Sequence, residues 1–272
     1  MRSNQPSIRL RRLYCNQDLT SQEVWLTPDE SKHALRVLRL QPGDRCLLTT
    51  GNGWEAEAEL LSSDKKGACF KILARHYEKR GFFIPVAVLP AWIKKGKMDL
   101  LLEKAQEFGC ASFQPIVCEY SDYDLDPNRY EAVKERWKKI AHETAKQSGA
   151  TEIIQVDKPA TFKDALNSLA ADTLVLIFHP HAPAEKWVDA ALRLRESTDP
   201  KKYQKIYIFI GPEGGFSPAE IEAASMLKHP GIHIIKMGLT ILKADTAFIA
   251  ALAGLSFFIN EKSPGGASSE AT

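Results

Sequence analysis

The feature that most constrains the fold is a set of apolar runs that alternate with helical patterns through the second part of the chain. Phe83–Leu89, Leu174–His179 and Ile206–Ile210 are apolar at nearly every position, as strands are when helices cover both faces of a sheet. Helical patterns lie between these runs, at Gly96–Phe108 and Asn128–Ser148. Strands that alternate with helices predict an α/β fold with a parallel sheet.

The first 75 or so residues have a different pattern, in which short β-prone runs are separated by turn residues. Asn52-Gly53 between two such runs predicts a hairpin. Thr27-Pro-Asp-Glu30 has the form of a helix capping box. Many short strands at close spacing favour a small β-barrel. The expected strands are Arg9–Tyr14, Glu23–Leu26, Arg45–Thr50, Trp54–Leu61 and Gly67–Ala74.

The composition is that of a folded protein and excludes several other classes. With 272 residues, 44% hydrophobic and 26% charged, the chain is neither disordered nor a disulfide scaffold. The net charge of +2 means that a nucleic-acid surface has to be a local patch. We expect no membrane span and no secretory signal. The five cysteines are scattered and form no CxxC pair, so we expect reduced thiols, no metal and a cytoplasmic location.

A glycine-rich loop follows the apolar run Ile206–Ile210. Gly211-Pro-Glu-Gly-Gly215 leads into Ser217-Pro-Ala-Glu220, a second capping box. Ligands bind at the carboxyl ends of strands in open α/β sheets, and glycines allow close approach of the backbone. The same glycines could serve only the geometry of a tight turn. The loop lacks the spacing of a phosphate-binding P-loop or of a dinucleotide site.

Other polar residues lie at the ends of expected strands. His179 could be a base, a ligand contact or an ordinary loop histidine. Lys243, Asp245 and Thr246 stand where the last helix begins, and either of the latter two could simply cap it. That helix, Asp245–Ile259, is apolar nearly all round, so it must be buried in the core or against another chain.

Basic residues near aromatics are suited to phosphate and base contacts. Those that we expect to bind RNA are Arg9, Arg11, Arg12, Arg36, Arg39, Lys94, Lys95 and Lys97.

Several ordered motifs together resemble the RsmE family, over nearly the whole chain. They are His33–Arg39, Pro42-Gly-Asp44, Lys97-Met-Asp-Leu100, Glu103–Gly109, the helix around Trp137 to Ser148, Gly211–Gly215 and Gly238–Ala247. Members of this family are S-adenosylmethionine-dependent methyltransferases that modify N3 of a uridine in 16S ribosomal RNA of the small ribosomal subunit. The resemblance implies the same activity here.

The resemblance also implies an architecture. Residues 1–78 would form a PUA-like RNA-binding β-barrel and 79–262 a SPOUT methyltransferase domain with a trefoil knot, followed by a disordered tail at 263–272. The protein would act as a homodimer, with interface contributions from the last helix and from Glu143–Gln147.

By the same resemblance, three loops would bind the cofactor. Their residues are Phe178, His179, Pro180, Ile210, Gly211, Pro212, Glu213, Gly214, Gly215, Met237, Gly238, Leu239, Ile241, Leu242 and Thr246. We hypothesise that Lys243 stabilises negative charge on the uracil, while Asp245 and Thr246 orient the loop or the base.

The chain departs from the family pattern at five positions, namely Tyr120, Ala150, Thr240, Lys243 and Asp245. Two alternatives therefore stay open. The protein could be a SPOUT enzyme with another RNA target, or a non-catalytic RNA-binding homologue.

Overall fold

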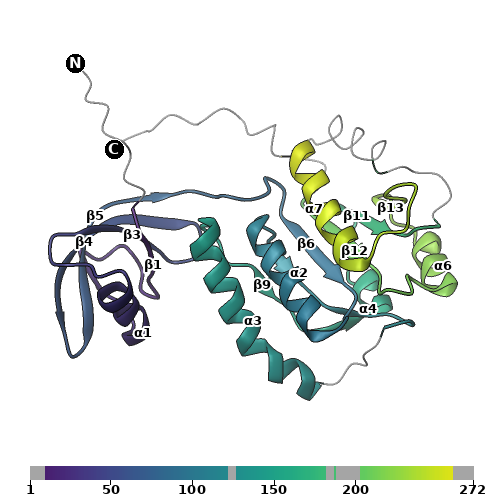
Figure 1. The fold of residues 1–272 in the computed structure, drawn as a ribbon. Coiled ribbons are helices and arrows are strands. Elements are labelled where there is room, and N and C mark those ends of the chain that lie inside the picture. The colour runs from purple at the N-terminus through teal and green to yellow at the C-terminus, as the bar shows by residue number, and fades with distance from the viewer. Residues whose placement is uncertain (1–9, 122–126, 182–186, 188–202, 260–272) are drawn as a thin grey trace. The chain divides into compact units, whose positions relative to one another are not determined.

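A computed structural model describes residues 10–121, 127–181, 187 and 203–259 (Figure 1). The chain forms two compact units. One comprises Met1–Arg80 with Glu143–Ile153, and the other comprises Gly81–His142 with Ile154–Thr272. In the described part, no helix has the length and apolar character needed to cross a membrane. Arg9 and the tail at 263–272 lie outside the described residues.

The first unit contains a five-stranded mixed sheet in the order β1-β3-β4-β5-β2. The hairpin predicted at Asn52-Gly53 is confirmed, since β3 and β4 pair antiparallel from Arg45↔Glu59 to Thr49↔Glu55. Gly53 has a φ of +94°, which glycine adopts without strain. The five expected strands are all present, as β1 (Arg12–Tyr14), β2 (Glu23–Trp25), β3 (Arg45–Thr49), β4 (Trp54–Asp64) and β5 (Gly67–Tyr77).

The helix expected after Thr27 forms, but only one of the two hydrogen bonds of the predicted capping box is present. The bond expected from the Glu30 side chain back to Thr27 is not made. Helix α1 (Pro28–Lys32) begins with the Thr27 hydroxyl accepting the Glu30 N–H, and a π-helical turn, η1 (His33–Val37), continues it. The Glu30 carboxylate instead accepts the Tyr14 N–H at 2.9 Å and pairs with Lys146 at 2.7 Å. A charged tertiary partner has replaced the local backbone bond.

The second unit is built on a six-stranded sheet in the order β13-β11-β12-β6-β7-β9, and every pair in it is parallel. The predicted parallel sheet is therefore confirmed. Strands β8 and β10 form a separate parallel pair. The strands are β6 (Val86–Pro90), β7 (Ser112–Phe113), β8 (Ile116–Val117), β9 (Gln155–Val156), β10 (Ala160–Thr161), β11 (Thr173–Phe178), β12 (Lys205–Ile210) and β13 (Ile232–Ile235).

Two very short strands, β7 and β8, follow each other closely between α2 and α3 and do not form one continuous strand. Pro115 lies between them and has no N–H to donate to a sheet ladder. Its carbonyl accepts the Ala160 N–H at 3.1 Å, which leads directly into the separate β8–β10 pair.

Helices cover both faces of this sheet (Figure 1). Helices α4 (Phe162–Asn167) and α6 (Pro218–Met226) contribute to the apolar cluster that contains Val175 and Phe209. Neighbouring strand residues point to the opposite face, where α7 (Ala244–Ile259) contacts β12 and α2 (Lys95–Glu107). The remaining described helix of this region is α3 (Pro127–Ser148).

The last turn of α3 and the segment after it belong to the first unit, which the sequence pattern does not indicate. Arg80 makes two hydrogen bonds to this segment. Its guanidinium donates to the Gly149 carbonyl at 3.0 Å, and its backbone N–H donates to the Thr151 hydroxyl at 3.1 Å. The first unit therefore needs residues from the middle of the chain.

Candidate cofactor pocket

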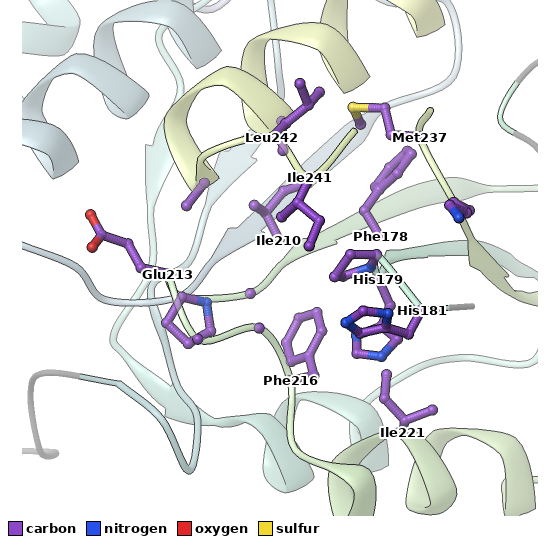
Figure 2. Close-up of a pocket in the computed structure, with 18 of the residues that line it drawn as sticks. Phe178, His179, His181, Ile210, Glu213, Phe216, Ile221, Met237, Ile241 and Leu242 are labelled. Atoms are coloured by element: carbon purple, nitrogen blue, oxygen red, sulfur yellow. The ribbon is translucent and has the colours of Figure 1, made fainter. Parts of the chain in front are cut away.

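The second unit has a cavity of about 630 Å³ at the carboxyl ends of three adjacent strands, β13, β11 and β12. Loops after each strand contribute to its wall, together with the first turns of α6 and α7 (Figure 2). This is the edge of an open parallel sheet at which ligands bind. The side chains are mainly apolar, with Glu213, Glu222, Lys236, Thr240 and two histidines as the polar exceptions.

The loop after β12 folds back on itself, and its glycines make that possible. The Gly215 N–H donates to the Pro212 carbonyl at 2.9 Å, and Gly215 has a φ of +75°. A Cβ on Gly211 would lie 3.2 Å from backbone atoms of Gly215 and Phe216. Gly211 thus lets the two ends of the loop approach each other more closely than a residue with a Cβ would allow.

Helix α6 starts immediately after this loop with the predicted capping box, which is confirmed in full. The Ser217 hydroxyl accepts the Glu220 N–H at 3.2 Å, and the Glu220 carboxylate accepts the Ser217 N–H at 2.8 Å. The second oxygen of Glu220 accepts the Glu119 N–H at 3.0 Å. These bonds fix the direction in which the chain leaves the loop.

The loops after β11 and β13 are held side by side. The His179 N–H donates to the Ile235 carbonyl at 2.9 Å, and the Trp187 N–H donates to the Lys236 carbonyl at 3.0 Å. The Trp187 ring packs edge-on against Phe178 at a centroid distance of 5.2 Å. These contacts bring two segments that lie far apart in sequence to one wall of the cavity.

His179 and His181 form a pair of imidazoles in this wall, with centroids 5.8 Å apart (Figure 2). Burial, and to a lesser extent the neighbouring His181, lowers the pKa of His179. Its Nδ1 is buried and has no hydrogen-bond partner within the described residues. Burial thus favours the neutral form of His179, whose Nδ1 is an unused polar atom at the cavity wall.

Of the residues expected to bind the cofactor, all but two line this cavity. The exceptions are Leu239, which is 98% exposed, and Thr246. Thr246 and Asp245 instead line a shallow hollow with Leu100, Ile249 and Ala250. The residues in the cavity are Phe178, His179, Pro180, Ile210, Gly211, Pro212, Glu213, Gly214, Gly215, Met237, Gly238, Ile241 and Leu242.

Further lining residues were not expected from the sequence. Phe216, Pro218 and Ile221 follow the glycine loop directly, so extending the motif into α6 could have found them. Lys236 directly precedes the expected Met237, and Glu222 directly follows Ile221, so a similar extension of the expected segments covers both. Ala244 and Ala247 complete the wall, together with His181 and Thr240, which lie inside the loops that the resemblance assigns to the cofactor.

Lys97, which we expected to contact RNA, has an acidic partner in the glycine loop. Its ammonium group donates to the Glu213 carboxylate. This bond first, and then the charges of Lys97, Lys94 and Lys243, lower the pKa of the Glu213 carboxyl. Lys243 is not among the cavity residues, but it is close enough to act on Glu213.

The basic residues of the first unit have several different environments. Arg12 forms an ion pair with the buried Glu55 at 2.7 Å, so its charge is compensated within the protein. Arg11 is exposed and donates to the Leu38 carbonyl. Arg36 and Arg39 are exposed. Outside this unit, Lys94 is exposed as well, while the side chain of Lys95 is outside the described part.

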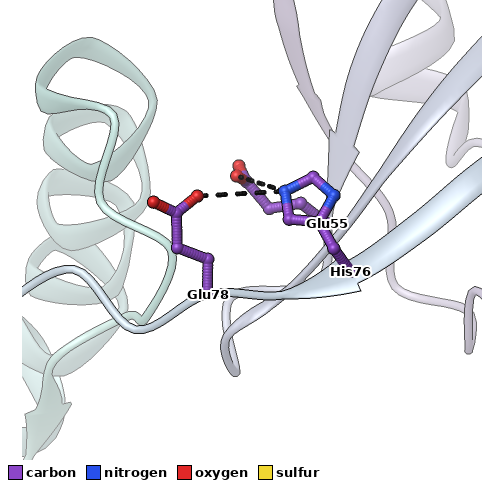
Figure 3. A group of neighbouring side chains, drawn as sticks. All are labelled: Glu55, His76 and Glu78. Carbon is purple, nitrogen blue, oxygen red and sulfur yellow. Dashed lines mark ion pairs between the residues drawn. The ribbon is translucent and has the colours of Figure 1, made fainter. Parts of the chain in front are cut away.

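Glu55, His76 and Glu78 form the one group of possible metal ligands found among the described residues (Figure 3). Their ligand atoms lie within 4.8 Å of one another. The Arg80 guanidinium, however, lies 3.3 Å from the Glu55 carboxylate and 2.5 Å from that of Glu78. Because an arginine cation is already between the carboxylates, a metal ion there would meet strong repulsion.

A parallel α/β sheet with a glycine-lined cavity at its strand ends, joined to a small mixed sheet, defines a class of ligand-binding α/β proteins. Comparison with known families identifies the class further. The family described as "RNA methyltransferase domain" matches residues 82–256, and "RNA methyltransferase PUA domain" matches residues 26–73. The chain belongs to this family of RNA methyltransferases.

The similarity to individual members is close to full length. Ribosomal RNA small subunit methyltransferase E of Bacillus subtilis is 27% identical, covering 88% of this chain and 94% of the relative. Ribosomal RNA small subunit methyltransferase E 2 of Borreliella burgdorferi is 30% identical, covering 81% and 85%. A Legionella pneumophila protein solved with bound SAM has a TM-score of 0.77 and 26% identity, covering 92% of this chain and 98% of that one. Within the family, the chain is thus a relative of ribosomal RNA small subunit methyltransferase E.

Proposed function

We propose that this protein transfers a methyl group from S-adenosylmethionine to N3 of a uridine in 16S ribosomal RNA of the small subunit. The observation that carries the proposal is the glycine-lined cavity at the ends of β11, β12 and β13. It lies within the part of the chain that matches the RNA methyltransferase domain. The relatives named ribosomal RNA small subunit methyltransferase E supply the substrate class.

The cavity fits an adenosyl cofactor. Ile210, Phe216 and Leu242 provide apolar walls, and the Gly211–Gly215 loop provides backbone donors and acceptors. The buried Nδ1 of His179 would gain the hydrogen-bond partner that it lacks among the described residues. The Legionella structure with bound SAM supports the same assignment. When bound, S-adenosylmethionine supplies an electrophilic methyl group.

The residues of the chain then have two tasks, to align the uridine and to favour loss of its N3 proton. Lys243, next to the rim of the cavity, would stabilise negative charge on the uracil oxygens. Asp245 accepts the Thr246 N–H at 2.9 Å at the start of α7. In the proposed mechanism, these two residues orient the loop or the base.

We further propose that the sheet of the first unit closes into a PUA-like barrel, with Arg11, Arg36 and Arg39 available to RNA phosphates. The second unit would carry the SPOUT trefoil knot, as the family resemblance implies. The domain limits near residues 78 and 262, the homodimer, the cytoplasmic location and the absence of a metal requirement belong to the same proposal.

A two-part experiment tests the proposed function. Calorimetry is expected to detect S-adenosylmethionine binding to the purified protein. Mass spectrometry of 16S rRNA nucleosides is expected to show 3-methyluridine in the parent strain and its loss in a deletion strain. Loss of a different methylated nucleoside would favour another RNA target. Cofactor binding without any lost modification would favour a non-catalytic homologue.

A lysine substitution tests the proposed role of Lys243. Lys243→Ala is expected to reduce methyl transfer by about 10- to 100-fold, because it removes one charge that acts on the transition state. Lys228→Ala removes an exposed lysine just after α6 and serves as the matched control. Full activity of the Lys243→Ala variant would contradict the assignment.

A further inference from the structure

The rim of the cavity holds one carboxylate among three lysines. Glu213 is 61% exposed, and its carboxylate bonds to the ammonium group of Lys97. Lys94 and Lys243 also act on it electrostatically. Figure 2 shows Glu213 at one side of the cavity, pointing away from the labelled histidines. The four charged groups come from the start of α2, the glycine loop and the segment before α7.

This arrangement has the character of an anion site in which a protein side chain is the anion. Among these described groups, three lysine charges face one carboxylate. Helix α2 begins here, has no acidic residue in its first turn, and its N-cap Lys94 makes no side-chain capping bond. A Cβ added at Gly96 would meet none of the described residues within 4 Å, so they leave the space beside this helix start open.

The contact between Glu213 and Lys97 is of a kind that another anion can replace. Exposed ion pairs are weak, because water screens them and two flexible side chains must be held together. A phosphodiester carries the same single negative charge as a carboxylate, and lysine binds either one as a point charge. The pair thus competes directly with any phosphate that reaches the rim.

We propose that the Glu213 carboxylate occupies the place of an RNA phosphate in the free protein and is displaced when RNA binds to Lys97. The inference rests on the proposed function, which requires RNA at this rim. Displacement would detach the side chain of Glu213 from α2 and release the Gly211–Gly215 loop, which lines the cofactor cavity. Glu213 is then a positioning residue that links RNA binding to the state of the loop.

The test is a double-mutant cycle on RNA affinity. Fluorescence anisotropy measures the binding of a short uridine-containing oligoribonucleotide, the probe, to the full-length protein. Glu213→Gln is expected to tighten binding about twofold to fivefold, because the Glu213 carboxylate no longer competes with phosphate for Lys97. It is also expected to steepen the salt dependence of binding by about 0.7 in log K against log salt, as for one added phosphate contact.

Lys97→Ala is expected to weaken binding, and adding Glu213→Gln to it should give much less than the gain seen with Lys97 present. Glu135→Gln removes the same charge from an exposed ion pair, with Lys138 on α3 outside the cavity, and is the matched control, expected to change affinity by less than about twofold. A Glu213→Gln protein that binds RNA no more tightly than the wild type overturns the proposal. So does an equal gain from Glu135→Gln, or an equal gain when Lys97 is absent.

These results are separable from the proposed function. Failure of the wild-type protein to bind S-adenosylmethionine or to methylate RNA counts against the function. A protein that does both, but shows no coupling between Glu213 and Lys97 in RNA binding, counts against the inference alone.

Discussion

Glu55 has a fully buried side chain that carries a charge in the first unit. Arg12, Arg80 and His76 lie 2.7, 3.3 and 3.7 Å from its carboxylate oxygens. Neither oxygen accepts a hydrogen bond of normal geometry within the described residues, so these ion pairs have to compensate its loss of hydration. Removing the charge would leave the Arg12 guanidinium, which is 12% exposed, without its partner.

We therefore expect Glu55→Gln to lower the free energy of unfolding by about 3 kcal/mol. Urea denaturation followed by fluorescence measures this change. Glu78→Gln removes an exposed carboxylate from the same Arg80 and is the control, with an expected cost below about 1 kcal/mol. Equal effects of the two substitutions would show that burial of Glu55 is energetically unimportant.

His179 leads to a prediction about pH. Its pKa lies below the ordinary histidine value because the side chain is buried, so below about pH 6.5 the unfolded chain binds more protons than the folded chain. The stability that neutral His179 contributes is complete above the unfolded pKa and declines as the pH falls toward the lowered pKa.

We expect His179→Gln to flatten the loss of stability between about pH 7 and pH 5.5. Urea midpoints measured across this range provide the test. Ser225→Ala on α6 changes no titratable group, is the control and should leave the slope as in the wild type. An unchanged slope in the His179 variant would be inconsistent with a lowered pKa.

At the scale of single elements, the cavity depends on how α6 begins. The capping box joins the glycine loop to the helix through reciprocal Ser217 and Glu220 bonds, and Ser217 is only 1% exposed. A buried N-cap is not easily replaced by water, so the end of the loop and the start of the helix are fixed together.

Ser217→Ala is expected to cost about 1 kcal/mol of stability and to weaken S-adenosylmethionine binding through the loop. Calorimetry and thermal unfolding measure the two effects. Ser225→Ala, on the same helix, is the matched control, because the Ser225 hydroxyl only bonds back to the Ile221 carbonyl. Its expected effect is neutral or slightly stabilising, since alanine favours helix. Loss of stability in both variants alike would mean that the cap has no special role.

At the scale of the whole molecule, the last helix, α7, leaves a large apolar side chain exposed. This helix is apolar along most of its length and packs against β12 and α2, yet Phe257 is 71% exposed. A large apolar side chain at the end of such a helix is a candidate contact for a second copy of the chain. The proposed homodimer would bury it.

Sedimentation velocity tests this prediction. The wild type is expected to sediment at twice the chain mass of 30.3 kDa, and Phe257→Glu is expected to shift the population toward the monomer by placing a charge in the interface. Met226→Glu alters an equally exposed apolar residue, at 70%, on α6 and should leave the dimer intact. A wild-type monomer, or a dimer unaffected by Phe257→Glu, would refute the interface.

The local features of this protein could be predicted from the sequence, because neighbouring residues determine them. Apolar runs gave the parallel strands β6, β11 and β12, and the hairpin at Asn52-Gly53 and the capping box at Ser217 depend on interactions within a few residues. The glycine loop was likewise located by its own residues. The family resemblance added the prediction that three separate loops come together to bind the cofactor.

Only the tertiary structure decided which partners distant residues acquire. The Glu30 carboxylate bonds to Tyr14 and Lys146 in place of the local capping bond. Residues 143–153 belong to the first unit, and Lys97 bonds to Glu213. Each outcome depends on segments about 16 to 116 positions apart in sequence being packed together. The strength of such a contact comes from burial and charge in the folded chain, and no pattern of nearby residues contains that information.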